Sequence, residues 1–233
     1  MGYKEYSTTG NLLDSEKSQF TDIEGFEVGL DYLSSKEGNS YSKIKTSILR
    51  VIGNSAYTGS ILGGASVYGS RTSTTANDIV DIGISYNIYH TLSNNLSYNY
   101  GLGFGYRSWR RALSVSQVET YQWLSLRPSI GMGMKIDSEF KTSIDVSYQH
   151  GLKPKMYASN LDSTFALGSA NIVELALGLT YKFNEKMNFF TDYTLQKQTI
   201  GKSNTIVSGS YAYHEPDSIA YNQYLKLGVS FKY

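Results

Sequence analysis

The sequence predicts an all-β protein, a ten-stranded antiparallel up-and-down transmembrane β-barrel that forms a single domain over residues 1–233. Three observations predict this fold class. Apolar and polar residues alternate over long segments, which is the period of a β-strand. Most of these segments have about 11–17 residues, which exceeds a typical soluble strand and suffices for a tilted strand to cross a bilayer. Short and long connections also alternate along the chain, as they do in barrels that span membranes.

The composition excludes several classes of protein. The 21 basic and 20 acidic residues nearly balance, so the chain has no charge footprint for nucleic acid. The absence of cysteine excludes disulfides and thiolate metal sites, and a count of only three histidines argues against a histidine-rich metal site. No apolar run reaches the roughly 18 residues of a membrane helix. We therefore expect no cofactor, no metal and no nucleic-acid partner.

Ten strands follow from the alternation. The clearest is the last, in which Leu225, Leu227 and Val229 share one face. The first is short and alternates poorly, but closure of the barrel requires it to pair with the last, with Glu5 facing inward near Lys226 or Lys232. In chain order, the predicted strands are 2–8, 24–35, 41–54, 77–90, 95–111, 118–136, 139–151, 171–183, 187–199 and 221–233.

The connections predict an orientation. The tight turns are rich in Gly, Asn and Asp, whereas the longer loops are rich in Ser, Thr, Gly and Asn. Short turns at the periplasmic end and longer extracellular loops are typical of outer-membrane barrels, and an even strand number places both termini at the turn end. The predicted turns are 36–39, 91–94, 137–138 and 184–186. The predicted loops are 9–23, 55–76, 112–117, 152–170 and 200–220.

Two places disturb the pattern. Ile48 and Leu49 break the alternation, which predicts a β-bulge there. Pro128 falls inside the sixth strand, where it removes one ladder hydrogen bond. The alternation of Leu126 and Ile130 continues across Pro128, so we expect the strand to be continuous.

Alternation alone fits two kinds of barrel. A soluble barrel turns its apolar face inward, whereas a membrane barrel turns it toward lipid. The loop asymmetry, the aromatic residues near strand ends and the glycine-rich polar face favour the membrane barrel. We therefore expect four apolar side chains to face lipid near the middle of the bilayer. They are Ile84, Val146, Leu177 and Leu227.

The C-terminus carries the pattern Lys226-x-Gly228-x-x-Phe231-x-Tyr233. It resembles the terminal signal of bacterial outer-membrane proteins, and the stretch from Tyr3 to Glu16 looks like the start of small ten-stranded outer-membrane barrels without an assigned activity. The resemblance implies assembly by the barrel-assembly machinery in a Gram-negative outer membrane, with its lipid and lipopolysaccharide as partners. No export signal is visible at the start, which is consistent with one removed before Met1. No motif of the omptin proteases or of the Opc-type adhesins is present.

The inward face is strongly charged. A barrel of ten strands is scarcely wider than its own side chains, so we interpret these charges as a salt-bridged network that fills the interior. A narrow selective pore is the alternative. The predicted interior charge network comprises Glu27, Asp31, Asp81, Asp145, Glu174, Asp192 and Lys226.

The fifth and sixth predicted strands carry the densest group of candidate binding residues. If inward residues pair with numbers that sum to about 230, Arg111 faces Glu119, which permits an ion pair. Arginine over tryptophan permits a cation–π contact. The group is either an aromatic, basic pocket at the outer mouth for an anion or a sugar, or packing that stiffens the hairpin. Its members are Arg107, Trp109, Arg111, Glu119, Tyr121, Trp123 and Arg127.

Catalytic signals are weak. His150 lies five residues after Asp145, and His214 precedes Glu215, but no nucleophile-elbow or metalloprotease motif accompanies them. The sequence therefore predicts a non-enzymatic, monomeric outer-membrane barrel with a largely filled interior, whose loops interact with an unknown extracellular ligand or adhere to a surface. The alternatives are a narrow channel for ions or small solutes, and an outer-membrane protease or lipid-modifying enzyme.

Overall fold

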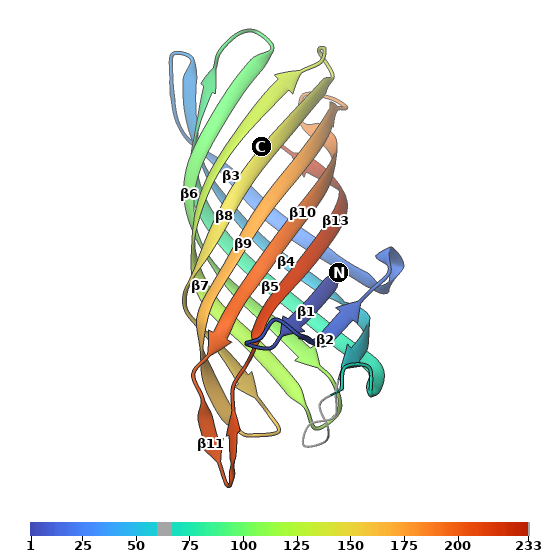
Figure 1. Cartoon of the computed structure of the whole chain (residues 1–233). Coiled ribbons are helices and arrows are strands. Elements are labelled where there is room, and N and C mark those ends of the chain that lie inside the picture. The colour runs from blue at the N-terminus through green and yellow to red at the C-terminus, as the bar shows by residue number, and fades with distance from the viewer. Residues whose placement is uncertain (60–66, 233) are drawn as a thin grey trace.

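The computed structural model describes residues 1–59 and 67–232, and it shows a long, tilted β-barrel (Figure 1). A single 3-10 turn, η1 (Phe20–Asp22), interrupts the strands near the N-terminus. In chain order, the strands are β1 (Gly2–Tyr6), β2 (Leu12–Lys17), β3 (Ile23–Glu37), β4 (Ser40–Gly59), β5 (Arg71–Thr91), β6 (Leu96–Ala112), β7 (Val118–Lys135), β8 (Phe140–Ala158), β9 (Ser163–Lys182), β10 (Met187–Ser203), β11 (Ile206–Ser208), β12 (Tyr211–Tyr213) and β13 (Asp217–Phe231).

Ten of these strands close a ring in which every neighbour is antiparallel. The ring runs β1, β13, β10, β9, β8, β7, β6, β5, β4 and β2, and β2 pairs again with β1. The short hairpin of β11 and β12 lies outside the ring and projects at the end that carries the longer connections, which we name the loop end (Figure 1). The opposite end, with the tight turns, is the turn end. The predicted fold class is confirmed.

No helix in the described part of the chain is long and apolar enough to cross a membrane.

The N-terminal part of the ring differs from the prediction. The segment 9–23 is not a loop, because it contains β2, which lies in the wall between β1 and β4. β2 and β3 lie end to end along the same edge of β4. The sequence pattern did not predict β2 because its sequence, Leu-Leu-Asp-Ser-Glu-Lys, lacks an alternating apolar face.

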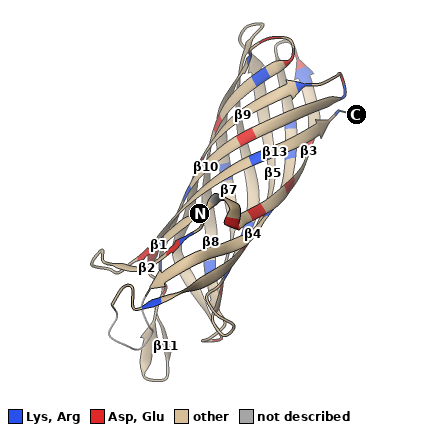
Figure 2. Cartoon of the chain, turned by 90° about the vertical axis from the view of Figure 1, so that its right-hand side faces the viewer, with Lys and Arg blue, Asp and Glu red and all other residues tan. Residues whose placement is uncertain are grey.

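Pairing of the first and last strands is confirmed, but at an unexpected height. β1 pairs with Asp217–Tyr221, the loop-end part of β13. Glu5 therefore faces inward opposite Ser218, far along β13 from Lys226, and the expected ion pair with Lys226 or Lys232 is wrong. Met1 consequently lies halfway along the barrel rather than at the turn end, as Figure 2 shows.

The wall has two zones with opposite polarity. Toward the turn end, apolar side chains point outward, and Ile84, Leu177 and Leu227 are 52%, 45% and 78% exposed. Toward the loop end, the apolar side chains point inward and form a buried cluster that includes Val51 and Phe165. The outward apolar zone is the surface that a bilayer covers, so the four side chains expected to face lipid, Val146 included, lie on the outside as predicted. The loop-end zone projects beyond the membrane.

This inversion explains two errors. The bulge predicted at Ile48 and Leu49 is absent, because β4 pairs with β5 in unbroken register from Ser40 to Gly59. Ile48 faces outward in the lipid zone, and Leu49 packs inward against the apolar cluster, so a change of zone imitated a slip of register. The strands also continue past the inversion. The predicted loop 152–170 shrinks to four residues, 159–162, between β8 and β9.

The irregularities of the wall lie elsewhere. The β3–β4 register shifts between Leu33 and Ser35, and the β7–β8 register shifts between Gln122 and Leu124, near Lys153 with its φ of 47°. β7 is continuous through Pro128, and its ladder with β8 resumes in the same register on either side. The expected effect of Pro128 is thus confirmed as a local gap in pairing. Tyr233 and the part of the predicted loop 55–76 at 60–66 lie outside the described residues.

Candidate functional site

The predicted pairing across β6 and β7 is confirmed residue by residue. Arg111 lies opposite Glu119, Trp109 opposite Tyr121, and Arg107 opposite Trp123. Gly103 lies opposite Arg127, and the smaller inward residues of β6 make room for that side chain. At Gly105, a Cβ atom would come within 2.0 Å of the Arg127 guanidinium carbon.

Arg111 is the centre of the site. Its guanidinium is fully buried in the loop-end zone and contacts carboxylates from three different strands. The nitrogen-to-oxygen distances are 3.1 Å to Glu5 on β1, 2.6 Å to Glu16 on β2 and 2.8 Å to Glu119 on β7. Such charge-assisted bonds hold the first two strands against the middle of the sheet.

Aromatic rings complete the surroundings of this guanidinium. Its carbon lies 3.9 Å from the ring centre of Tyr3 and 5.5 Å from that of Trp109, which are cation–π distances. The Tyr3 and Tyr121 hydroxyl oxygens each lie 3.1 Å from Arg111 Nη1. Trp109 donates its indole N–H to Asn77 over 3.0 Å. The acceptor oxygens and the rings leave no face of the guanidinium open to solvent, in agreement with its burial.

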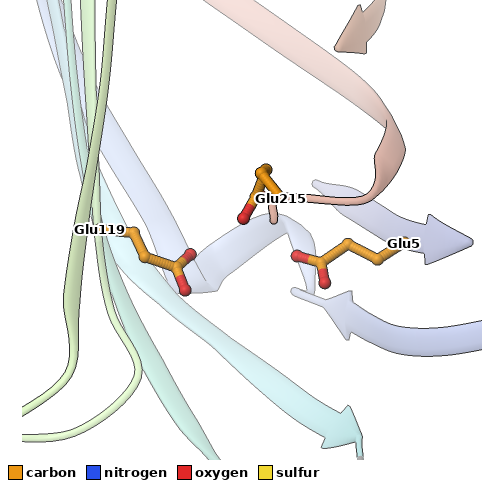
Figure 3. Close-up of side chains that lie close together, drawn as sticks. All are labelled: Glu5, Glu119 and Glu215. Carbon is orange, nitrogen blue, oxygen red and sulfur yellow. The ribbon is translucent and has the colours of Figure 1, made fainter. Parts of the chain in front are cut away.

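A fourth loop-end carboxylate, Glu215, joins from the segment between β12 and β13. Oxygens of Glu5, Glu119 and Glu215 lie within 4.8 Å of one another, and Figure 3 shows the three side chains converging. Tyr121 donates a hydrogen bond to Glu215, which ties the last loop to the cluster. Burial raises the pKa of Glu215 well above its usual range, and the neighbouring Glu5 and Glu119 raise it further.

This spacing of three carboxylates is one that a metal ion could use. Arg111 Nη1, however, already lies within 3.1 Å of Glu5 and 2.8 Å of Glu119, so the cluster contains its own cation. We name Tyr3, Glu5, Glu16, Arg111, Glu119, Tyr121 and Glu215 the arginine cluster.

A second ionic layer lies beneath the arginine cluster. Asp81 forms ion pairs with Arg107 at 3.0 Å and with Arg127 at 2.6 Å. Arg107 also donates to Gln196 and Gln198 of β10, so its contacts cross the lumen. Through these two layers, β6 is bonded across the interior to β1, β2 and β10.

The predicted outer-mouth residues are therefore packed against one another. Five of the seven, Arg107, Trp109, Arg111, Tyr121 and Trp123, are at most 2% exposed. This burial favours the interpretation of the group as packing. Binding of an anion or a sugar there stays a prediction. Such a ligand would have to displace the contacts among these side chains.

The rest of the predicted interior charge network is divided into local pairs. Lys226 bonds Glu27 at 2.7 Å, and Lys43 bonds Asp31 at 3.3 Å. Asn99 donates to Asp145 over 3.3 Å, and Gln196 donates to Glu174 over 2.7 Å. Asp192 lies opposite Lys226 in the β10–β13 register. The turn-end lumen is thus polar and less densely filled than the loop end.

His150 does not assemble with Asp145, the carboxylate nearest to it in sequence. His150 faces outward and bonds Asn171 at 2.9 Å, on the opposite face of β8 from Asp145. His90 bonds the Ser40 hydroxyl at 2.7 Å at the turn end.

Sequence reasoning missed four members of the arginine cluster as site residues. Tyr3, Glu5 and Glu16 come from the first two strands, and Glu215 from the last loop. Alternating Tyr3 and Glu5 on a strand that must close the barrel was the one available signal. Glu16 and Glu215 gave none, because their segments do not alternate.

An apolar pocket lies on the outer wall of the barrel. It has a volume of about 460 Å³ and is lined by outward apolar side chains of β3 to β7, among them Val28, Ile82 and Phe104. It lies in the lipid-facing zone, away from the arginine cluster.

No family profile and no curated protein matches the sequence. Among solved structures, the toluene transporter TbuX of Ralstonia pickettii is 11% identical with a TM-score of 0.39, over 99% of this chain and 71% of that one. The toluene transporter TodX of Pseudomonas putida is 10% identical with a TM-score of 0.33, over 100% and 71%. The outer-membrane expressed OmpT of Vibrio cholerae is 12% identical with a TM-score of 0.28, over 88% and 64%. These likenesses are too distant to carry an argument about ligand or activity. The protein's own ring of strands and outward apolar zone identify it as an integral β-barrel of a Gram-negative outer membrane.

Proposed function

We propose that this protein is a non-enzymatic, monomeric outer-membrane barrel that is sealed at its loop end and presents that end to the surroundings for surface interaction or adhesion. The observation that carries the proposal is the filling of the loop-end interior. The arginine cluster lies above the layer of Arg107 and Asp81, and an apolar cluster packs beside both. A pore for solutes would need a continuous polar path through this level.

The outer surface of the loop end supports a role in interaction. Apolar side chains stand exposed at the tips of the connections, where no lipid covers them. Val115 is fully exposed, and Val207 and Tyr211 in the β11–β12 region are 72% and 67% exposed. Exposed apolar and aromatic residues on projecting loops are typical of surfaces that bind other molecules.

The proposal also includes two partners, the barrel-assembly machinery and lipopolysaccharide. Phe231 stands outward at the turn end, 60% exposed, and Gly228 lies inward, which suits a terminal signal read on the last strand. Arg110, Lys155 and Lys197 are exposed on the outer wall beyond the apolar zone. Cations at that position fit the phosphates of lipopolysaccharide.

Conductance separates the sealed barrel from the narrow channel. The refolded chain, inserted in a planar bilayer, is expected to give no discrete openings at moderate voltage. Replacement of the arginine-cluster centre, as Arg111→Ala, is expected to produce transient openings, whereas Arg110→Ala on the outer face of the same strand is not. Regular single-channel steps from the unmodified protein would refute the seal and favour the channel.

An activity assay tests the non-enzymatic part. Refolded protein incubated with peptides or lipopolysaccharide is expected to leave both unchanged. Cleavage or modification that disappears in His150→Ala or His214→Ala would replace this proposal with the enzyme alternative.

A further inference from the structure

The apolar pocket on the outer wall is a groove between two rows of outward side chains. The rows are neighbours along the strands, because a single row of residues that face the lumen separates them. In that inner row, a Cβ atom at Gly83 or Gly105 would point at the lumen side chain of Arg127, so the backbone of this row forms the floor of the groove. The loop-end row is Ile48, Ile82, Tyr106 and Leu124, and the turn-end row is Thr46, Ile84 and Phe104.

The dimensions and lining of the groove suit a hydrocarbon chain. Outward residues two positions apart on a strand are separated by about 7 Å, which sets the width between the rows. Thr46 is the shortest member of the turn-end row, and its hydroxyl donates to the Leu30 carbonyl over 3.4 Å, so the lining stays apolar. The volume of about 460 Å³ is in the range of pockets that hold small molecules.

Basic side chains replace apolar ones on the outer wall directly beyond the groove, toward the loop end. Arg50 and Arg110 follow the loop-end groove residues of β4 and β6 by two and four positions. Lys155 of β8 lies opposite Gln122, which precedes the groove residue of β7 by two positions. All three basic side chains are exposed on the outer wall. We name Arg50, Arg110 and Lys155 the basic border.

The basic border has hydrogen-bond donors to spare. Arg50 donates from Nε and Nη2 to the Asp78 carboxylate over 3.2 and 2.9 Å, which orients its side chain and leaves Nη1 for another acceptor. The side chains of Arg110 and Lys155 have no hydrogen bond or ion pair within residues 1–59 and 67–232. Beyond the groove, Asp78 is the one outward carboxylate on β4 to β8, all of whose residues the structure describes. The basic border therefore offers free cations beside an apolar groove.

We propose that the groove and the basic border together bind one molecule of lipopolysaccharide, with an acyl chain of its lipid A in the groove and a phosphate on Arg110 and Lys155. The inference rests on the proposed function, in which lipopolysaccharide is a partner, and it gives that partner one defined site. The loop end of the barrel faces the leaflet that carries this glycolipid. Arginine and lysine form charge-assisted hydrogen bonds with phosphate, and cations at the edge of an apolar surface match an anionic lipid.

Other candidate occupants match the site less well. A second copy of the chain that covered the groove would place one basic border against another, and like charges in contact are unfavourable. A phospholipid carries a single phosphate, so it fills the groove but uses only part of the basic border. Lipid A combines several acyl chains with more than one phosphate, so it alone among the three occupies both parts of the site.

Purified lipid A, titrated into phosphatidylcholine vesicles that contain the refolded full chain, tests the site. Because the chain has no cysteine, a single environment-sensitive dye can be attached at Val80→Cys or Leu126→Cys, which border the groove without lining it. Leu177→Cys, on the outward face of β9, is the matched control. Heat-modifiable migration on a gel verifies that each labelled variant is folded, and either groove reporter suffices if the other does not fold. A saturable spectral shift is expected at the groove reporters and none at Leu177→Cys.

Variants separate the two parts of the site. Arg110→Gln/Lys155→Gln is expected to raise the lipid A concentration for half-saturation by about tenfold or more, because two charge-assisted bonds are lost. Thr46→Phe, which fills the groove and leaves every cation in place, is expected to have a similar effect. The matched control is Lys4→Gln/Lys17→Gln, which removes two exposed cations from β1 and β2 and is expected to change half-saturation by less than about twofold.

Several results would overturn the site. Equal losses in the basic-border variant and in its control would show a general attraction of lipopolysaccharide to the wall, which keeps the partner but refutes the site. Equal half-saturation by phosphatidylglycerol would replace the glycolipid with a phospholipid, and an unchanged response in Thr46→Phe would remove the acyl chain from the groove. Absence of any shift with lipid A would refute the site while the conductance test of the sealed loop end stands apart from it.

Discussion

Removal of the Arg111 guanidinium is the sharpest test of what holds this barrel together. Arg111→Met keeps much of the side-chain volume but removes the cation that Glu5, Glu16 and Glu119 share. These three carboxylates then remain buried among tyrosines with no positive partner. Because Glu5 and Glu16 belong to β1 and β2, the variant also loses the link between those strands and β6.

The magnitude follows from the burial. The guanidinium is 0% exposed, and its carboxylate partners are 9%, 0% and 12% exposed at the side chain, so solvent screens them little. Removal of one partner from a buried ion pair typically costs about 3–5 kcal/mol. We expect a loss in that range at neutral pH. The loss should shrink in acid, because protonated glutamates no longer need the cation.

The assay is denaturant unfolding of the refolded protein in vesicles, followed by tryptophan fluorescence, which reports on Trp109 and Trp123. Arg110→Met is the matched control, since Arg110 lies on the same strand but is exposed on the outer wall. The control is expected to change the free energy of unfolding by less than about 0.5 kcal/mol. An Arg111→Met variant as stable as the Arg110→Met variant would refute the view that the arginine cluster anchors β1 and β2.

Three further predictions concern the last loop, the lipid zone and the lumen. The raised pKa of Glu215 means that the folded protein holds this proton more tightly than the unfolded chain, so its favourable contribution is complete in acid and is lost as pH rises through the folded pKa. The Tm of Glu215→Gln should therefore equal that of the unmodified protein in acid, and it should be higher at pH values above the ordinary pKa of glutamate. Identical Tm values at every pH would contradict this. Leu177→Arg, on the outward face of β9, should lower the free energy of unfolding in vesicles by about 2–4 kcal/mol, and a neutral effect would remove Leu177 from the bilayer. Gly105→Val should displace the Arg127 side chain, whose guanidinium carbon lies 2.0 Å from the position of the new Cβ, and so lower stability; a variant with unchanged unfolding would contradict the packing described there.

The register of the middle strands was predictable because it depends on local information. Alternation has a period of two residues, and a short connection between β6 and β7 leaves one register that keeps apolar residues on one face. Arg111 opposite Glu119 follows from these two facts alone. The lipid-facing direction of Leu177 and Leu227 also follows, since long apolar stripes at strand period need an apolar solvent.

The ends of the strands were less predictable because the solvent changes along the wall. Beyond the membrane, the apolar residues turn inward, so the same pattern carries the opposite meaning. Ile48 and Leu49 on β4 fall at that change and imitate a bulge. The change of zone depends on how the barrel sits in its bilayer, so it cannot be read from a short stretch of sequence.

The tertiary structure alone decided how the chain closes and what fills it. Arg111 meets Glu16 and Tyr3, which lie 95 and 108 residues away in sequence. Contacts of this kind produce no periodic pattern in the sequence, because only the curvature of the wall brings β1 and β2 against the inward face of β6. The sequence by itself determined the middle strands, their faces and their neighbours, all of which are fixed by local alternation and short turns. Closure of the ring and the filled loop end depend on contacts across the lumen, and only the folded barrel defines them.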